Sequence, residues 1–219
     1  MVERYDRTGP AKELDTSAIS TPVYRVHQED FCQALRVHPS HKYQNEGGPG
    51  PLEIVGLLRA HAVFAAGSKL RDDAKHTEDD VSAFLGALIL NWLIGGTDAH
   101  AKSYSLIIGG GGLVRLAPLY DIASVFAYRD VDPRRAKLAM KIGDEYRLDS
   151  IGLPQWRKFA AMVRYDVDAL VQRIRAMAAE LPDRLSDEVN RMRRSGLSHD
   201  IIDRLATSLP DRARRAAAL

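Results

Sequence analysis

The chain has 219 residues, of which 45% are hydrophobic and 27% are charged, and its formal net charge is +2. These values predict one globular domain with a substantial core, and they give no reason to expect binding to nucleic acid or to an anionic membrane. A single cysteine excludes an internal disulfide and suits a reducing compartment. The sequence shows no signal peptide, and its longest apolar run, 81–94, is too short to span a bilayer, so we expect a cytoplasmic protein.

The first part of the chain is predicted to alternate loops with short elements. Residues 8–20 are polar and indicate a loop, and 23–26 is a candidate strand. Apolar residues at helical spacing predict a short helix over 28–35. Pro, Gly and Asn are frequent over 38–51, which indicates a second loop, and a helix is expected near 51–66.

The strongest helical pattern begins at Thr77. This residue is a suitable cap, and three acidic residues follow it in the first turn. Apolar residues then recur at helical period on more than one face, which predicts a buried helix: Val81, Phe84, Leu85, Leu88, Ile89, Trp92 and Leu93. We expect Gly95 and Gly96 to end this helix, so that a rigid element delivers the chain to Asp98.

The second half is predicted to contain a hairpin followed by helices. Two strands, 104–108 and 113–116, are expected to pair across four consecutive glycines. A further strand is expected at 137–142, and the pattern after it is helical. The predicted fold class is mainly α (α+β), with a single domain over 1–219 made of a helical bundle and a small β-hairpin. Its last part, 190–219, is rich in Arg and Ala and is expected to be a helical tail that frays.

Two aspartates are the first candidates for chemistry. Asp98 follows the predicted buried helix, and Asp121 follows the predicted hairpin. Enzymes of the protein-kinase type use such a pair, in which one carboxylate accepts the proton of the substrate hydroxyl and the other holds Mg²⁺ against the nucleotide phosphates. The alternative for Asp98 is an aspartate that caps a turn, and the alternative for Asp121 is the N-cap of the segment 122–126.

Three further residues, all in the loop that contains Asp98, are candidates for a part in this chemistry. Ser103 lies five residues after Asp98, where the kinase catalytic loop has a metal-binding Asn. A hydroxyl can also ligate Mg²⁺, although Ser is shorter than Asn, which weakens the case for firm metal binding. Lys102 is a candidate for neutralising charge on the transferred phosphoryl group, with a solvated loop lysine as the equal alternative. His100 is expected to orient the loop rather than to act as an acid or base.

The run TDAHAKSYSL over 97–106 and the run LAPLYDIAS over 116–124 resemble the catalytic core of the HipA-like serine/threonine kinases, the toxins of bacterial toxin–antitoxin modules. Further blocks resemble that family in the family's order, namely 1–7, 27–35, 42–49 and 137–140. Together the blocks cover roughly 1–165, so the resemblance does not depend on one short motif.

The resemblance implies a protein-kinase-like C-terminal lobe of the HipA type. Such a lobe transfers the γ-phosphoryl group of ATP to a protein Ser or Thr hydroxyl, with Mg²⁺ as cofactor. By the resemblance, Asp98 is the base, Asp121 is the main metal ligand and Ser103 is a second ligand. The family's usual partner is a DNA-binding antitoxin, and its substrate class includes an aminoacyl-tRNA synthetase. No membrane partner and no direct nucleic-acid contact are expected.

The first block, 1–7, is similar to the strand and hinge that join the two kinase lobes, so we expect a C-terminal lobe without its N-terminal lobe. Glu3 and Tyr5 match hinge positions that meet the adenine through the backbone, and with His100 and Asp121 they form the predicted ATP site. The glycine-rich loop and the nucleotide-positioning lysine would belong to the N-terminal lobe. A separately encoded partner is one source for that lobe.

The rival interpretation is a truncated, catalytically inactive remnant that at most binds an antitoxin or another partner. It is favoured by the expected lack of an N-terminal lobe and by Ser103 in place of the metal-binding amide. Electrostatic clamping supplies most of phosphoryl-transfer catalysis, so losing half of the clamp would cost several orders of magnitude in rate.

Two other features have simpler explanations than a functional site. Cys32 lies in the short amphipathic segment and is expected to be a core residue rather than a nucleophile. His38 and His41 have a spacing seen in metal sites, but they lie in a loop without a carboxylate or cysteine partner, so zinc is not expected there.

Overall fold

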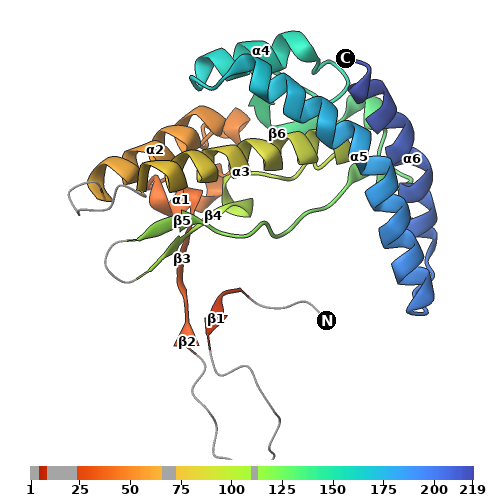
Figure 1. Ribbon diagram of the computed structural model, residues 1–219, viewed down its shortest axis with the longest axis horizontal. Coiled ribbons are helices and arrows are strands. Elements are labelled where there is room, and N and C mark those ends of the chain that lie inside the picture. The colour runs from red at the N-terminus through yellow and green to blue at the C-terminus, as the bar shows by residue number, and fades with distance from the viewer. Residues whose placement is uncertain (1–4, 9–23, 66–72, 110–112) are drawn as a thin grey trace, which may run out of the picture.

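The computed structural model describes residues 5–8, 24–65, 73–109 and 113–219. Within these residues the chain is mainly α-helical, with three small antiparallel sheets, as Figure 1 shows. The mainly α class predicted from the sequence is therefore confirmed. No helix among the described residues is both long enough and apolar enough to cross a membrane.

Helix α3 (Asp73–Ile94) runs through the middle of the molecule, and α2 (Pro51–Ala65) packs beside it (Figure 1). Its apolar positions are buried as predicted, with Phe84, Leu85 and Ile89 fully enclosed. The expected start at Thr77 is wrong, because the helix already begins at Asp73. The residues between include Ala and Lys, which are good helix formers, so the helix extends past a residue that is also a competent cap.

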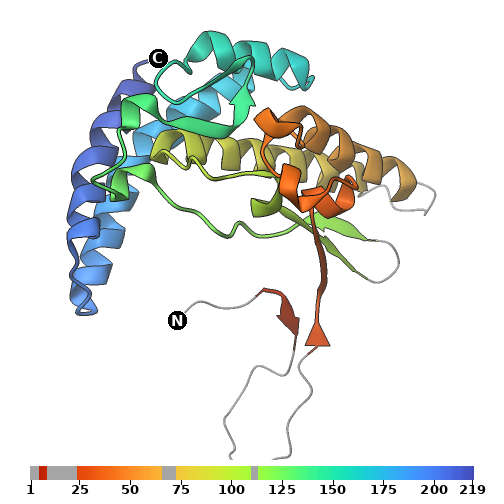
Figure 2. The ribbon, with the colours of Figure 1, turned by 180° about the vertical axis from the view of Figure 1, so that it is seen from behind.

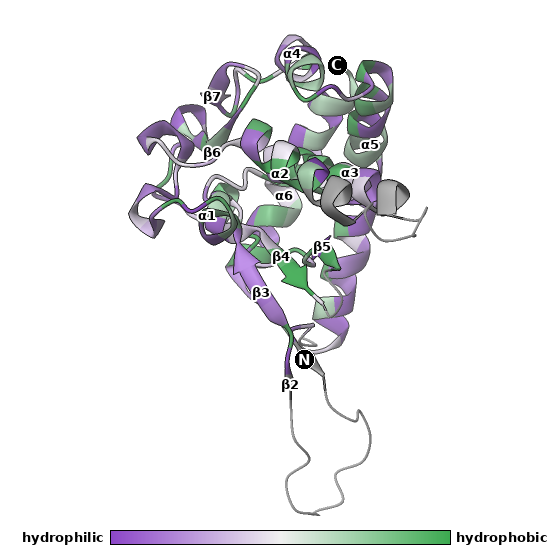
Figure 3. Ribbon diagram, turned by 90° about the vertical axis from the view of Figure 1, so that its left-hand side faces the viewer, coloured by the Kyte–Doolittle hydropathy of each residue, from purple (hydrophilic) through white to green (hydrophobic). Residues whose placement is uncertain are grey.

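A three-stranded antiparallel sheet lies beside α3, in the order β3 (His27–Asp30), β4 (Ser105–Ile108) and β5 (Val114–Leu116). The hairpin predicted for the last two strands is confirmed, with Leu106 opposite Leu116. Figure 3 shows that β4 is hydrophobic whereas β3 is hydrophilic. The sheet therefore presents a polar strand at the edge farthest from β5.

The helix predicted over 28–35 is wrong in its first half. Residues 27–30 pair with β4 instead, and only α1 (Phe31–Ala34) is helical. Asp30 lies at the boundary, where its carboxylate accepts a hydrogen bond from the Gln33 amide and the Gln33 side chain accepts one from the Asp30 amide, both at 3.0 Å. This reciprocal cap ends the strand and starts the helix.

Smaller elements complete the two ends of the lobe. Strand β1 (Arg7–Thr8) pairs with β2 (Tyr24–Arg25) in a separate two-stranded sheet. The strand predicted at 137–142 is confirmed as β6 (Lys137–Ile142), which pairs with β7 (Glu145–Arg147). Short 3₁₀ turns punctuate the loops, at Pro39–His41, Gln44–Glu46, Ala101–Ser103, Val125–Ala127 and Pro133–Arg135.

The C-terminal part consists of α4 (Leu153–Met162), α5 (Val167–Arg194) and α6 (Asp200–Ala217). Figure 2 shows α6 lying along α5 and reaching the end of α3. We expected the tail from 190 onward to fray, but its helix is packed instead. The reason is a helical stripe of small and apolar residues that the composition obscures, with Leu209, Ala213 and Ala216 buried.

Leu88 offers a test of the central position of α3, because its side chain is only 4% exposed. Leu88→Ala should lower the free energy of unfolding by about 2–5 kcal/mol, through lost burial and a residual cavity. Urea unfolding measures this change. Leu197→Ala is the matched control, since Leu197 is 59% exposed and should change stability by about 0.5 kcal/mol or less. An unchanged midpoint for Leu88→Ala would show that α3 does not form the core.

Candidate active site

The site begins where α3 ends. Gly95 has a φ of +70°, and a Cβ added there would meet Phe126 Cε2 at 2.6 Å, so glycine is required by both conformation and space. The Gly96 amide donates to the backbone oxygen of Asn91 at 2.6 Å, and the Val125 amide donates to the backbone oxygen of Gly95 at 2.9 Å. The predicted glycine stop is thus confirmed, and it delivers the chain directly to Asp98.

Asp98 has an exposed side chain that is held from one side. Tyr43 donates its hydroxyl to Asp98 Oδ1 at 2.6 Å, and the Asp98 backbone oxygen accepts the His100 amide at 2.9 Å and Ser103 Oγ at 3.3 Å. Ionising Tyr43 would place two negative charges together, so the hydrogen bond to Asp98 raises the pKa of Tyr43 to about 12. The sequence placed Tyr43 in a family block, but nothing in the pattern showed its contact with Asp98.

His100 is buried at the centre of the loop. Its Nδ1 hydrogen-bonds with Ser103 Oγ at 3.0 Å, and its ring meets the Tyr43 ring edge-on at 5.1 Å. Burial and the positive charge of Lys42 lower the pKa of His100, while the charges of Asp98 and Asp121 oppose this lowering. The imidazole therefore takes up a proton less readily than a free one, and its contacts with Ser103 and Tyr43 hold it within the loop.

Asp121 approaches the same loop from the segment after β5. It is exposed and has a left-handed backbone, with a φ of +55°, a conformation that Asp adopts more readily than most residues but that still carries strain. Asp121 and Ser103 line one small pocket. The alternative of Asp121 as an N-cap does not hold, because Ser124 caps the following turn by accepting from the Phe126 amide.

The donors at this pocket suit magnesium chemically. A carboxylate and a hydroxyl are hard oxygen ligands, and Mg²⁺ in proteins commonly uses one or two protein ligands and keeps several waters. The Ser103 hydroxyl also contacts His100 and the Asp98 oxygen, so those contacts hold it in place at the pocket. Among the described residues no group of three or more His, Cys, Asp or Glu side chains gathers in one place.

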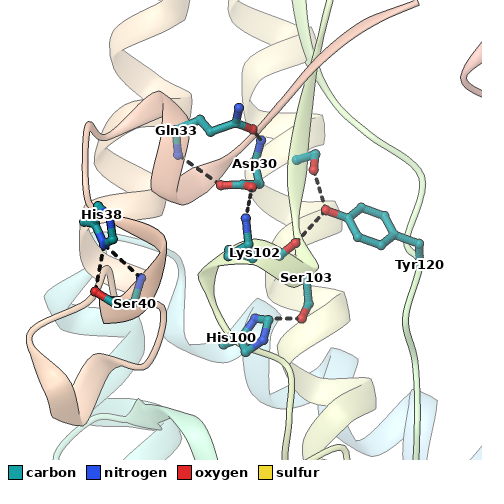
Figure 4. A network of polar contacts seen from close by, with 9 residues as sticks. Asp30, Gln33, His38, Ser40, His100, Lys102, Ser103 and Tyr120 are labelled. Atoms are coloured by element: carbon teal, nitrogen blue, oxygen red, sulfur yellow. Dashed lines mark hydrogen bonds and ion pairs between the residues drawn. The ribbon is translucent and has the colours of Figure 1, made fainter.

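Lys102 points away from this pocket, toward the end of β3, as Figure 4 shows. Its Nζ lies 2.6 Å from Asp30 Oδ2, and its backbone oxygen accepts the Tyr120 hydroxyl at 2.8 Å. Tyr120 also hydrogen-bonds with Ser105 Oγ. The structure therefore shows an ion-paired lysine rather than a solvated one, and Asp30 both caps α1 and anchors the loop.

A polar cleft of about 460 Å³ opens beside this network, and its lining includes Lys102, Asp30, Tyr120, Gln28, Arg25 and Asp6. Tyr5 directly precedes Asp6, which lines the cleft, and burial raises the pKa of Tyr120. The Val26 amide donates to the Asp6 oxygen at 3.0 Å, which ties the first described segment to the cleft. The predicted site residue Glu3 lies outside the described residues.

Cys32 and His38 both have structural roles. Cys32 is fully buried, and burial raises the pKa of its thiol, so it is a core residue. His38 Nδ1 accepts from the Ser40 amide at 3.3 Å and contacts the Ser40 hydroxyl at 2.8 Å (Figure 4). His38 therefore caps its own turn.

A helical lobe in which a buried central helix and a β-hairpin each lead into an acidic loop is the architecture of a kinase-like C-terminal lobe. Residues 1–185 match the family model described as the HipA-like C-terminal domain. The chain belongs to that family. The resemblance seen in the sequence motifs is therefore confirmed, and it concerns the C-terminal portion of HipA proteins.

Comparison with individual proteins agrees with this assignment. The chain is 39% identical over 160 residues to a Sinorhizobium fredii protein named "Putative kinase Y4mE", covering 73% of this chain and 32% of that protein. It is 29% identical over 190 residues to the serine/threonine-protein kinase toxin HipA of Shewanella oneidensis, covering 86% and 40%. The chain thus spans about a third to two fifths of the length of these curated relatives.

A solved structure gives the same result for the fold. The structure of the Shewanella oneidensis MR-1 toxin–antitoxin system, with HipA, HipB and its operator DNA, matches with a TM-score of 0.71 and 26% sequence identity. The match covers 97% of this chain and 47% of the solved chain. The chain therefore has the fold of the matching part of a solved HipA-system chain.

The Tyr43–Asp98 hydrogen bond can be tested by titration. In Asp98→Asn the pKa of Tyr43 should fall from about 12 towards the ordinary tyrosine value of ~10, because the tyrosinate no longer faces a carboxylate. The ¹³Cζ NMR signal of Tyr43, identified by its loss in Tyr43→Phe, reports the titration. Asp187→Asn, at an exposed position on α5, is the control and should leave the pKa of Tyr43 unchanged. A Tyr43 titration identical in Asp98→Asn and wild type would mean that the bond does not form in solution.

Proposed function

We propose that this chain is the catalytic C-terminal lobe of a HipA-like serine/threonine kinase that acts as the toxin of a toxin–antitoxin module. The supporting observation is that Ser103 joins the two segments that carry the aspartates. Ser103 lines one small pocket with Asp121, and its hydroxyl contacts both the Asp98 backbone oxygen and the buried His100 ring. The reaction breaks the bond between the γ-phosphorus of ATP and its bridging oxygen and forms a bond to a protein Ser or Thr oxygen.

In this proposal Asp98 accepts the proton that the acceptor hydroxyl loses. Its carboxylate is exposed, so a docked side chain can reach it within hydrogen-bond distance. Tyr43 fixes Oδ1 at 2.6 Å, and the other oxygen of the carboxylate is free of that contact and can take the proton. Tyr43 thereby sets the orientation of the base without competing for both of its oxygens.

Asp121 and Ser103 would hold the magnesium ion, and the bound ion would neutralise charge on the nucleotide phosphates. The polar cleft lined by Lys102, Asp30 and Tyr120 has a volume within the range of small-molecule sites. We assign the ATP to this cleft, with Tyr5 next to its lining residue Asp6 and with His100 orienting the loop that carries Lys102. Lys102 already pairs with Asp30, so a role for it on the phosphoryl group requires that pair to open.

The chain matches less than half of its relatives' length. The proposal therefore includes a source for the groups that bind the nucleotide phosphates from the other side of the cleft. We propose that a glycine-rich phosphate loop is contributed by additional sequence or by a separately encoded N-terminal lobe. The Shewanella oneidensis structure contains HipB and operator DNA, and by analogy we propose a DNA-binding antitoxin as a partner of this chain. An aminoacyl-tRNA synthetase is the substrate class that the family suggests.

A second candidate function is a non-catalytic module that binds an antitoxin. One observation favours it: the Ser103 side chain is already committed to His100 and to the Asp98 oxygen, and it is shorter than the amide that kinases use. In that case Asp98 and Asp121 would persist as structural residues of a degenerate site.

Calorimetric titration of Mg·ATP into the purified chain separates the two functions. Wild type should release heat, and Asp121→Asn should weaken binding by at least about tenfold, because a charged ligand to the ion is lost. Asp187→Asn is the matched control, because it removes an exposed carboxylate from α5 and should leave the affinity unchanged. Equal affinity in wild type and Asp121→Asn would contradict the kinase proposal. Absence of heat in wild type would favour the binding module, or a lobe that binds nucleotide only together with its N-terminal lobe.

Ser103 can be tested in both directions. Ser103→Asn restores the amide that kinases place here and should tighten Mg·ATP binding, whereas Ser103→Ala should weaken it. The same calorimetric titration provides the measurement. Equal affinities in wild type and both variants would show that this position does not govern the metal.

A further inference from the structure

The end of α3 depends on hydrogen bonds from distant segments, because the last carbonyl groups of a helix have no partner within it. Ser124 Oγ donates to the Ile94 oxygen at 2.5 Å. Arg212, from α6, donates through Nε and Nη2 to the Trp92 oxygen at 3.1 and 2.9 Å. A cation at this place is also favoured by the helix dipole, whose negative end lies at the C-terminus of α3.

Arg212 is held in a site that surrounds its guanidinium group. The residue is 8% exposed, and the group lies against the rings of Trp92 and Phe126, with its carbon 5.7 and 5.8 Å from the two ring centres. Nη1 pairs with Asp149 Oδ1 at 2.9 Å, and Nη2 reaches the Leu148 oxygen at 3.4 Å. A buried cation is costly unless it is paired and fully hydrogen-bonded, and Arg212 meets both conditions.

These contacts reach the start of the Asp98 loop and the turn that follows Asp121. Trp92 lies just before Gly95 and Gly96, from which the chain passes to Asp98. Phe126 belongs to the turn that follows Asp121, and its ring lies so close to Gly95 that a Cβ there would collide with it. The guanidinium group therefore joins the exit of α3 to the segment that carries Asp121. Arg212 lies beyond residues 1–185, which the family model matches.

We propose that Arg212 is a positioning residue of the phosphoryl-transfer site. By capping α3 and stacking on Phe126, it fixes the placement of the Asp98 loop relative to the Asp121 segment. Helix α6 is then part of the framework of the site, although it contributes no group to the chemistry. The inference rests on the proposed function for the roles of the two aspartates, but the placement itself can be measured without any activity.

Amide hydrogen exchange in the full chain is the primary test. In Arg212→Lys, which keeps the charge but loses the forked contacts, the Gly96 and Val125 amides should exchange at least about tenfold faster than in wild type. Slowly exchanging amides of β6, which Arg212 does not contact, should keep their rates. Arg214→Gln is the matched control, because Arg214 lies on the same helix but is exposed and paired with Asp211. It should leave the Gly96 and Val125 amides unchanged.

A milder variant keeps the test decisive if Arg212→Lys folds poorly. Asp149→Asn removes the negative charge that pairs with Nη1 but leaves the contacts with the Trp92 oxygen in place. It should speed exchange at Gly96 and Val125 by less than Arg212→Lys does. A uniform acceleration of all slow amides, in either variant, would show that Arg212 contributes only global stability and would overturn the proposal. Unchanged rates at Gly96 and Val125 would overturn it as well.

The second measurement connects the placement to nucleotide binding. Arg212→Lys should weaken Mg·ATP binding relative to Arg214→Gln, because Asp121 and Ser103 would no longer be held together. Equal affinities in the two variants would contradict the positioning role. If wild type binds no Mg·ATP, this chain alone has no nucleotide site, whereas the exchange result still decides whether Arg212 positions the two segments.

Discussion

The burial of α3 is the constraint on which the lobe depends. Its apolar positions are enclosed by α2, the three-stranded sheet and the C-terminal helices, so the helix has one packing arrangement and ends at one place. That fixed end determines where the Asp98 loop starts. The partners that satisfy the last carbonyls of α3, Ser124 and Arg212, also fix the segment after Asp121. The packing of α3 in the core therefore also determines the geometry of the site.

The groups of the site differ in burial and in charge. His100 is buried, whereas the carboxylates of Asp98 and Asp121 are exposed. Lys102 and Asp30 form a pair on the cleft side, where they join the loop to the start of α1. The loop is therefore held both by contacts of the buried His100 ring and by an ion pair, while Asp98 and Asp121 remain at the surface.

The sequence predicted the elements whose signals are local. The buried stripe of α3, the glycine stop and the hairpin each follow from spacing within one segment, and the structure has all three. Residues 28–30 were predicted to be helical because so short a segment cannot reveal its period, and the pairing of 27–30 with β4 is a long-range contact. The bonds that shape the site, Tyr43 with Asp98 and Asp30 with Lys102, join residues 55 and 72 positions apart, which no pattern in either segment encodes. The packing of Arg212 was hidden by an Arg-rich composition that suggested a solvated tail.

The bond between Arg212 and the Trp92 oxygen spans 120 positions of the chain, and this has a consequence for the order of folding. Contacts that close such long loops form late, because the loss of chain entropy must be met before the contact stabilises anything. During synthesis α3 and the hairpin leave the ribosome well before α6 does. The two acidic loops therefore acquire their final placement only after residue 212 has been added and has docked. By the proposed role of Arg212, a nascent chain that already contains both aspartates still lacks the contacts that place them, because α6 supplies those contacts.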